Sequence, residues 1–240
     1  DLAWTWLLLR FPPMIVPVEE LKRGGVTTDA ERVFEDHLRL YRDSLPGDRR
    51  HLVDRFRYAH LARKVVGVGS VGTRDWIVLL LGSDGDDPLF LQVKEASASV
   101  LAPYMAPSEY DNQGRRIVEG QRLMQAASDI FLGWLRAKGV ADGVARDFYV
   151  RQLWDWKIDA DIERMSPTGM HFYGRACGWT LARAHARSGD RIAIAAYLGS
   201  NDTFATAIAE FAESYADQNE RDHRALHDAV ATGRLVADER

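Results

Sequence analysis

The chain has 240 residues, of which 46% are hydrophobic and 28% are charged, and its formal net charge is −4 at pH 7. This composition is typical of a soluble globular protein, and the charge gives no general electrostatic reason for binding nucleic acid or an anionic membrane. The single cysteine, Cys177, excludes an internal disulfide framework and a cysteine-based zinc site, so the cytoplasm is the expected location. Its helical surroundings predict a small buried apolar side chain.

The N-terminal part is expected to form a connector followed by helices. Its apolar run at 2–9 ends far short of a membrane span and lacks the basic residues that open a signal peptide. Thr28 and Glu31 have the spacing of a capping box, which predicts a helix that begins there and ends near Pro46. A second helix is predicted over 48–62.

A glycine-rich loop then separates two strand-like runs, and a third run follows. The predicted strands cover 63–68, 75–82 and 88–95. Glycine lets the backbone approach phosphate oxygens in conformations that a Cβ would forbid, and protein kinases cover the phosphates of ATP with a G-x-G-x-x-G loop. The loop residues expected to bind phosphate are Gly67, Val68, Gly69, Ser70 and Gly72.

Lys94, late in the third strand, is expected to contact the α- and β-phosphates of the nucleotide. A helix glutamate should hold its ammonium group, and Glu119 lies on the helix predicted over 114–138, where that partner belongs. A solvated helix charge explains Glu119 nearly as well. Glu95 is an alternative partner, but neighbouring strand residues point to opposite faces of a sheet. Arg74 is either a further phosphate contact or an ordinary surface charge.

A dinucleotide-binding fold shares this glycine spacing, but there the third glycine opens a helix whose N-terminus holds the pyrophosphate. Here Gly72 is followed by the strand-like run 76–81. Asp86 and Asp87 lie near the distance of a ribose-binding acid, so this Rossmann-type alternative stays open. A tight glycine hairpin without a ligand also explains the glycines, although it does not explain the lysine on the following strand.

A further strand is predicted over 148–153, and helices follow it, the first beginning at Ser166. In a kinase arrangement this strand leads into the hinge between two lobes, where the backbone of Gln152 and Leu153 would face the adenine ring. Ordinary sheet core explains the strand equally well. The expected parts are an N-terminal connector with helices at 1–62, an N-lobe-like ATP-binding sheet with a helix at 63–155, and a helical C-lobe-like part at 156–240.

The residues that would complete phosphoryl transfer are not evident after these strands. His185 and Asp190 imitate a kinase catalytic loop, but their spacing is too long, and Asp190 is typical of a helix N-cap. His223 and His227 share a helix face at metal-ligand spacing without a third ligand, which favours an exposed polar face. The catalytic residues are therefore unknown, and no metal ligand is assigned.

Six segments carry a further signal: A-R-K-V-V-G-V-G-S-V-G-T-R at 62–74, D-P-L-F-L-Q-V-K-E-A at 87–96, G-Q-R-L-M-Q-A-A-S-D at 120–129, F-Y-V-R-Q-L at 148–153, L-A-R-A-H-A at 181–186 and Y-A-D-Q at 215–218. They closely resemble a widespread bacterial family labelled domain of unknown function 2252. The similarity runs from about residue 40 to the C-terminus.

The resemblance implies a protein-kinase-like, aminoglycoside-phosphotransferase-like α+β fold, with a small antiparallel-sheet N-lobe and a mainly helical C-lobe. Members of the family carry a G-D-x-H-x-x-N-like stretch and an acidic N-D-F-D-like stretch ahead of the glycine loop, which resembles a circular permutation of the kinase arrangement. This chain is then expected to begin after those motifs, as part of a longer protein that uses ATP and Mg²⁺. The resemblance does not identify the acceptor.

The first hypothesis is the nucleotide-binding part of a kinase-like phosphotransferase, in which the glycine loop and Lys94 hold the phosphates of ATP. Its acceptor would be an unknown small molecule or protein side chain. The alternative is a non-catalytic kinase-like module that senses a nucleotide or binds a protein. A Rossmann-type dinucleotide binder is the third hypothesis. None of these functions involves nucleic acid or a membrane.

Overall fold

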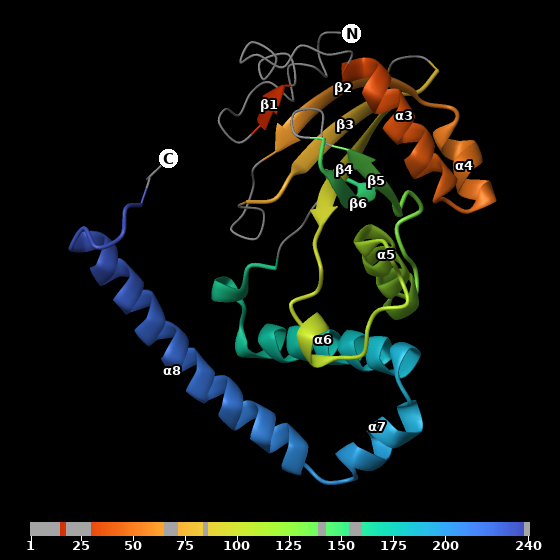
Figure 1. Cartoon of the computed structure of the whole chain (residues 1–240). Coiled ribbons are helices and arrows are strands. Elements are labelled where there is room, and N and C mark those ends of the chain that lie inside the picture. The colour runs from red at the N-terminus through yellow and green to blue at the C-terminus, as the bar shows by residue number, and fades with distance from the viewer. Residues whose placement is uncertain are drawn as a thin grey trace. The chain divides into compact units, whose positions relative to one another are not determined.

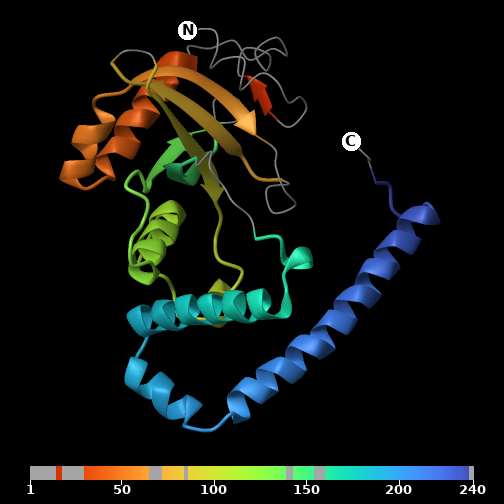
Figure 2. The same ribbon diagram turned by 180° about the vertical axis from the view of Figure 1, so that it is seen from behind.

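The structure, a computed structural model, describes residues 15–17, 30–64, 72–83, 86–138, 143–153 and 160–237. The chain forms two compact units, Asp1–Ala184 and His185–Arg240, and each is described by itself (Figures 1 and 2). The first unit is built around a β-sheet, whereas the second is helical.

The first unit contains both helices and strands. In chain order its elements are β1 (Ile15–Pro17), α3 (Ala30–Asp43), α4 (Gly47–Val53), β2 (Arg57–Lys64), β3 (Asp75–Leu81), β4 (Pro88–Ala96), α5 (Gln113–Met124), β5 (Gly133–Lys138), β6 (Ala145–Gln152) and most of α6 (Pro167–Ser188), with short 3₁₀ helices at Ala102–Tyr104 and Ile162–Arg164. The second unit contains α7 (Arg191–Leu198) and α8 (Thr203–Ala231). Across the described residues this is an α+β architecture with six strands and six α-helices, as the sequence predicted at the level of fold class.

The six described strands form one antiparallel sheet in the order β1-β2-β3-β4-β6-β5 (Figure 1). The register pairs Lys64 with Asp75, Asp75 with Lys94, and Lys94 with Tyr149. Paired residues of neighbouring antiparallel strands lie on the same face of a sheet. These four side chains therefore form one row across β2, β3, β4 and β6.

One face of the sheet packs against α3 and α4, and we call it the helix-covered face. One apolar cluster buries Leu80 from β3, Tyr41 from α3, Leu45 just after α3 and Val53 from α4. The Tyr41 hydroxyl donates a 2.6 Å hydrogen bond to the Phe131 carbonyl, and burial raises the pKa of the phenol. Burying a side chain such as Leu45 contributes about 1.5 to 3 kcal/mol to stability.

The opposite face carries Lys94, and we call it the Lys94 face. Its apolar part is the cluster of Ile77, Leu79 and Leu81 from β3, with Ile15, Phe90 and Leu153 packed against them. At the other edge α5 packs on β5 and β6. There the guanidinium groups of Arg115 and Arg122 each lie 5.6 Å from the ring centre of Trp134, which the register places on this face. The helix that follows β4 therefore shares a face with Lys94.

Two predicted helices are wrong in extent, because strand pairing replaces them. The helix predicted over 114–138 ends at Met124, and β5 begins at Gly133 and pairs with β6. The helix predicted over 48–62 ends at Val53, and β2 follows and pairs with β3. In both places apolar spacing fitted a helix, but hydrogen bonds to a distant strand decided the local structure.

Strand boundaries differ from the predicted ones mainly at β2, which covers 57–64 where the sequence predicted 63–68. Residues 65–68, and the proposed capping box at Thr28, lie outside the described residues. The predicted strands at 75–82, 88–95 and 148–153 are confirmed within three residues at each end.

The caps predicted for the later helices are confirmed. Ser166 Oγ accepts a hydrogen bond from the Gly169 amide at the start of α6, and Asp190 accepts from Ile192 and Ala193 at the start of α7. The prediction that the Cys177 side chain is buried is wrong, because Cys177 is exposed.

No described helix combines the length and the hydrophobicity that crossing a membrane requires.

Candidate nucleotide-phosphate site

The glycine-rich loop connects two antiparallel strands. Lys64 ends β2, Asp75 begins β3, and the two residues are paired in the register, so the residues between them join a β-hairpin. Gly72 has a φ of +82°, a left-handed conformation that favours glycine, and a strand follows it. The strand–loop–helix geometry of the Rossmann alternative is therefore not formed here. Gly67, Val68, Gly69 and Ser70 lie outside the described residues.

Lys94 lies at the end of the sheet from which this hairpin extends. Its ammonium Nζ is 3.6 Å from Asp75 Oδ2, an ion pair between adjacent strands. The Lys94 side chain is 28% exposed, whereas the Asp75 side chain is 2% exposed. The positive charge is thus open to a ligand while its carboxylate partner is enclosed.

Asp75 is held by a chain of hydrogen bonds that crosses three strands. Gln92 Nε2 donates to both carboxylate oxygens of Asp75, at 2.9 Å and 3.2 Å. Arg151 Nε donates to Gln92 Oε1 at 3.0 Å, which fixes the orientation of the amide. Asp75 and Gln92 are both buried, and a buried polar group without such partners would lower stability by about 1 to 3 kcal/mol.

The electrostatics of this network favour an anionic ligand. Burial raises the pKa of Asp75, and this effect is opposed by Lys94, the Gln92 amide and Lys64. Burial also raises the pKa of the half-buried Tyr149, against the opposing charge of Arg151. Lys64, Lys94 and Arg151 are three cations around one carboxylate, so this part of the face carries excess positive charge.

The partner expected for Lys94 is not the one that the structure gives. Arg122 Nη1 donates to Glu119 Oε1 at 3.3 Å within α5, and the ion pair that the structure records for Lys94 is with Asp75. Glu95, the alternative partner, lies on the helix-covered side of β4 and binds Arg74, whose Nη1 is 3.2 Å from its Oε2.

Sequence reasoning missed Asp75. Its alternation with Ile77 and Leu79 was visible and placed it on one face of a strand. Only the register between β3 and β4 shows that this face is shared with Lys94.

The predicted hinge residues use their amides within the protein. The Gln152 amide donates to Asp129 Oδ2 at 2.6 Å, and the Leu153 amide donates to the Phe90 carbonyl at 2.8 Å. Neither amide is therefore available to an adenine ring in this structure. The Leu153 side chain packs on the apolar cluster of the Lys94 face.

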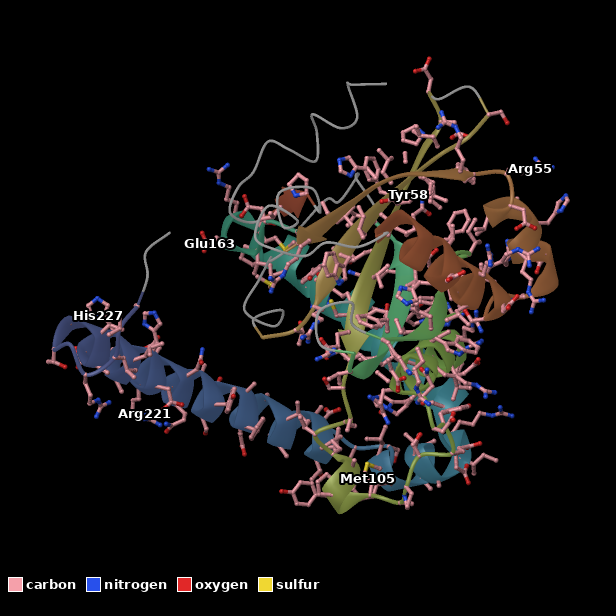
Figure 3. All side chains as sticks on the ribbon, turned by 45° about the horizontal axis from the view of Figure 1, so that its top comes forward. Arg55, Tyr58, Met105, Glu163, Arg221 and His227 are labelled. Carbon is pink, nitrogen blue, oxygen red and sulfur yellow. The ribbon has the colours of Figure 1, made fainter. Side chains whose placement is uncertain are left out.

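The histidine pair considered for a metal is an exposed helix face. Figure 3 shows the side chains of Arg221 and His227 projecting outward from α8, and both residues are exposed. Across the part of the chain that the structure describes, no group of three or more His, Cys, Asp or Glu side chains is placed to hold a metal ion.

Comparison with known proteins gives one match. A family described as "Uncharacterized protein conserved in bacteria (DUF2252)" matches residues 5–229. No curated protein and no solved structure matches the chain.

Proposed function

This chain belongs to that bacterial family, and we propose that it holds the phosphates of a nucleotide on the Lys94 face, as part of a kinase-like phosphotransferase. The observation that carries the proposal is the row Lys64–Asp75–Lys94 at the end of the sheet where the glycine hairpin begins. Backbone amides of such a hairpin and a nearby ammonium group are the parts with which kinases hold the triphosphate of ATP.

The order of elements supports the proposal. The glycine-rich loop is followed by β3, then by β4, which carries Lys94, and then by α5, which packs on the same face of the sheet. Kinases assemble the nucleotide site from a glycine loop, a strand lysine and a helix in this order. A kinase-like fold, circularly permuted so that the catalytic motifs precede this loop, is part of the proposal.

The residues fit the phosphates of ATP better than they fit its metal ion. Lys94 is partly exposed and lies among other cations, as phosphate binding requires. The described residues contain no cluster that could hold Mg²⁺, so we assign no metal ligand and no step that depends on one. Bound ATP would supply the phosphoryl group, and the side chains of this face would bind and orient its phosphates.

Titration of the chain with Mg-ATP tests the proposal. Lys94→Ala should weaken binding about 10- to 100-fold, because a hydrogen bond to a charged group contributes about 1.5 to 3 kcal/mol. Lys138→Ala is the matched control, since it removes the same charge from the exposed end of β5, and it should bind like the wild type. Wild-type affinity in Lys94→Ala would overturn the proposal.

A transfer assay separates the two kinase-like functions. Incubation of the chain with labelled ATP and a panel of small molecules and proteins should give labelled product if the protein is a phosphotransferase. Binding that depends on Lys94 without any transfer would instead support a nucleotide-sensing module.

A further inference from the structure

Lys94 has a carboxylate partner on the neighbouring strand, where kinases use a glutamate from a helix. We propose that Asp75 is the positioning residue for Lys94, and that it holds the ammonium group at the end of the sheet where β3 begins. This inference rests on the proposed function for its consequence in nucleotide binding, but the contact itself can be tested without a nucleotide.

The burial of the two partners assigns their roles. Asp75 is enclosed and Lys94 is partly exposed, so a ligand can reach the ammonium group but not the carboxylate. A buried anion that neighbours hold in one place is suited to fix a flexible side chain, because four torsion angles of a lysine would otherwise remain free.

The support behind Asp75 is rigid. Gln92 donates to both of its oxygens, Arg151 fixes Gln92, and all three residues come from strands in the middle of the sheet. A site built on paired strands holds its geometry more closely than one built on a loop or on a separate helix. Asp75 is also the first residue of β3, three positions after Gly72.

Lys64 occupies the other side of Asp75 in the row, and its charge opposes the burial that raises the pKa of that carboxylate. Asp75 therefore stands between two ammonium groups on the two strands that flank β3. Lys64 and Lys94 therefore lie on either side of the buried Asp75 carboxylate. Two neighbouring cations can bind a ligand with two or more adjacent anionic groups, such as a di- or triphosphate.

The sign of the effect of Asp75→Asn separates positioning from simple electrostatics. Removal of a negative charge beside two lysines should strengthen the binding of a polyphosphate if charge alone matters. If Asp75 positions Lys94, the same change should weaken Mg-ATP binding about tenfold, as loss of a supporting partner commonly does. Asp75→Glu should restore part of the affinity.

Two further variants serve as a control for the test and as a substitute if Asp75→Asn does not fold. Asp147→Asn is the matched control, because it makes the same chemical change on the same face beside Ala96, and it should leave affinity within about twofold of the wild type. If Asp75→Asn does not fold, Gln92→Leu provides a second route, since it keeps both charges but removes the donor that holds the carboxylate. Thermal melting of each variant checks that it is folded.

A nucleotide-free measurement makes the inference independent of the proposed function. Lysines of the chain are reductively methylated with ¹³C, and the Lys94 signal is assigned with Lys94→Arg. Asp75→Asn, or Gln92→Leu in its place, should increase the mobility of the Lys94 methyl groups, measured by ¹³C relaxation, whereas Asp147→Asn should leave it unchanged.

Mg-ATP binding and the NMR measurement on Lys94 distinguish failure of the positioning role of Asp75 from failure of the proposed nucleotide binding. Unchanged mobility of the Lys94 methyl groups, or Mg-ATP binding by Asp75→Asn as tight as or tighter than that of the wild type, overturns the positioning role and leaves the proposed function in place. A wild-type chain that binds no Mg-ATP defeats the proposed function. The methylation experiment then decides by itself whether Asp75 holds Lys94.

Discussion

The two faces of the sheet use the same strands for different purposes. On the helix-covered face Val78 and Leu80 belong to the apolar cluster that includes side chains of α3 and α4. Apart from Tyr41, the buried residues of this cluster carry no ionisable group. On the Lys94 face the alternate residues of β3 begin with Asp75 and continue with Ile77 and Leu79. A single strand thus contributes to a stabilising core and to a charged site, because successive side chains point to opposite faces.

The largest effect is expected on the helix-covered face. Leu45→Ala removes a side chain that is 1% exposed, and it should lower the free energy of unfolding by about 2 to 5 kcal/mol. Leu40→Ala on α3 is the control, because Leu40 is 49% exposed and its loss should change stability by less than about 0.5 kcal/mol. Urea denaturation measures both values, and equal losses would contradict the assignment of this face as the core.

A smaller loss is expected where α3 approaches β5. A Cβ at Gly133 would lie 2.6 Å from Ser44 Oγ and 2.7 Å from Tyr41 Cε2, so Gly133→Ala should lower stability by about 1 to 3 kcal/mol through overpacking. Gly120→Ala in α5 meets nothing within 4 Å and should raise stability by about 0.5 to 1 kcal/mol. A stabilising Gly133→Ala would show that this contact is looser than described.

A third effect depends on pH and concerns the edge of the Lys94 face. Burial would raise the pKa of Asp147, but the hydrogen bonds from Arg136 and from the Gln113 amide outweigh it, so the folded-state pKa is below the ordinary 3.8. Asp147 therefore adds stability above pH 3.8 that is lost as the pH falls through its folded-state pKa. Asp147→Asn should cost about 1 to 3 kcal/mol near neutral pH and progressively less in acid.

Urea titrations of the wild type and of Asp147→Asn between pH about 6 and about 3 measure this dependence. A difference between the two proteins that grows as the pH falls would have the wrong sign and would contradict the ion pair with Arg136.

The smallest change in stability is expected at Asp75, with the opposite dependence on pH. Its folded-state pKa is raised above 3.8, so its contribution is fully present below pH 3.8 and is lost as the pH rises through the folded-state pKa. Asp75→Asn should stay within about 1 kcal/mol of the wild type near neutral pH, because burying the charge and pairing it nearly cancel. Relative to this variant, the wild type should lose stability as the pH rises, which denaturation at several pH values measures.

Much of the Lys94 face could be predicted from local sequence. The strand that follows the glycine-rich loop and the strand that carries Lys94 each have a composition that indicates their structure without reference to the rest of the chain. The caps at Ser166 and Asp190 were equally local, because a side-chain oxygen at the start of a helix binds amides two or three residues away.

The parts that could not be predicted depend on contacts between distant segments. The spacing of Phe131 and Leu135 predicts the end of a helix where β5 lies, and only pairing with β6 selects the strand. Glu119 was chosen as the partner of Lys94 from the order of elements, although its side chain is paired with Arg122 in α5.

The amino-acid sequence by itself determined where β3, β4 and the later helices begin, because side-chain alternation and caps act over a few residues. Only the tertiary structure decided that Asp75 lies beside Lys94. The hydrogen-bond register of β3 and β4 sets which residues are opposite each other, and a shift of one residue would place Asp75 opposite Val93 or Glu95 instead.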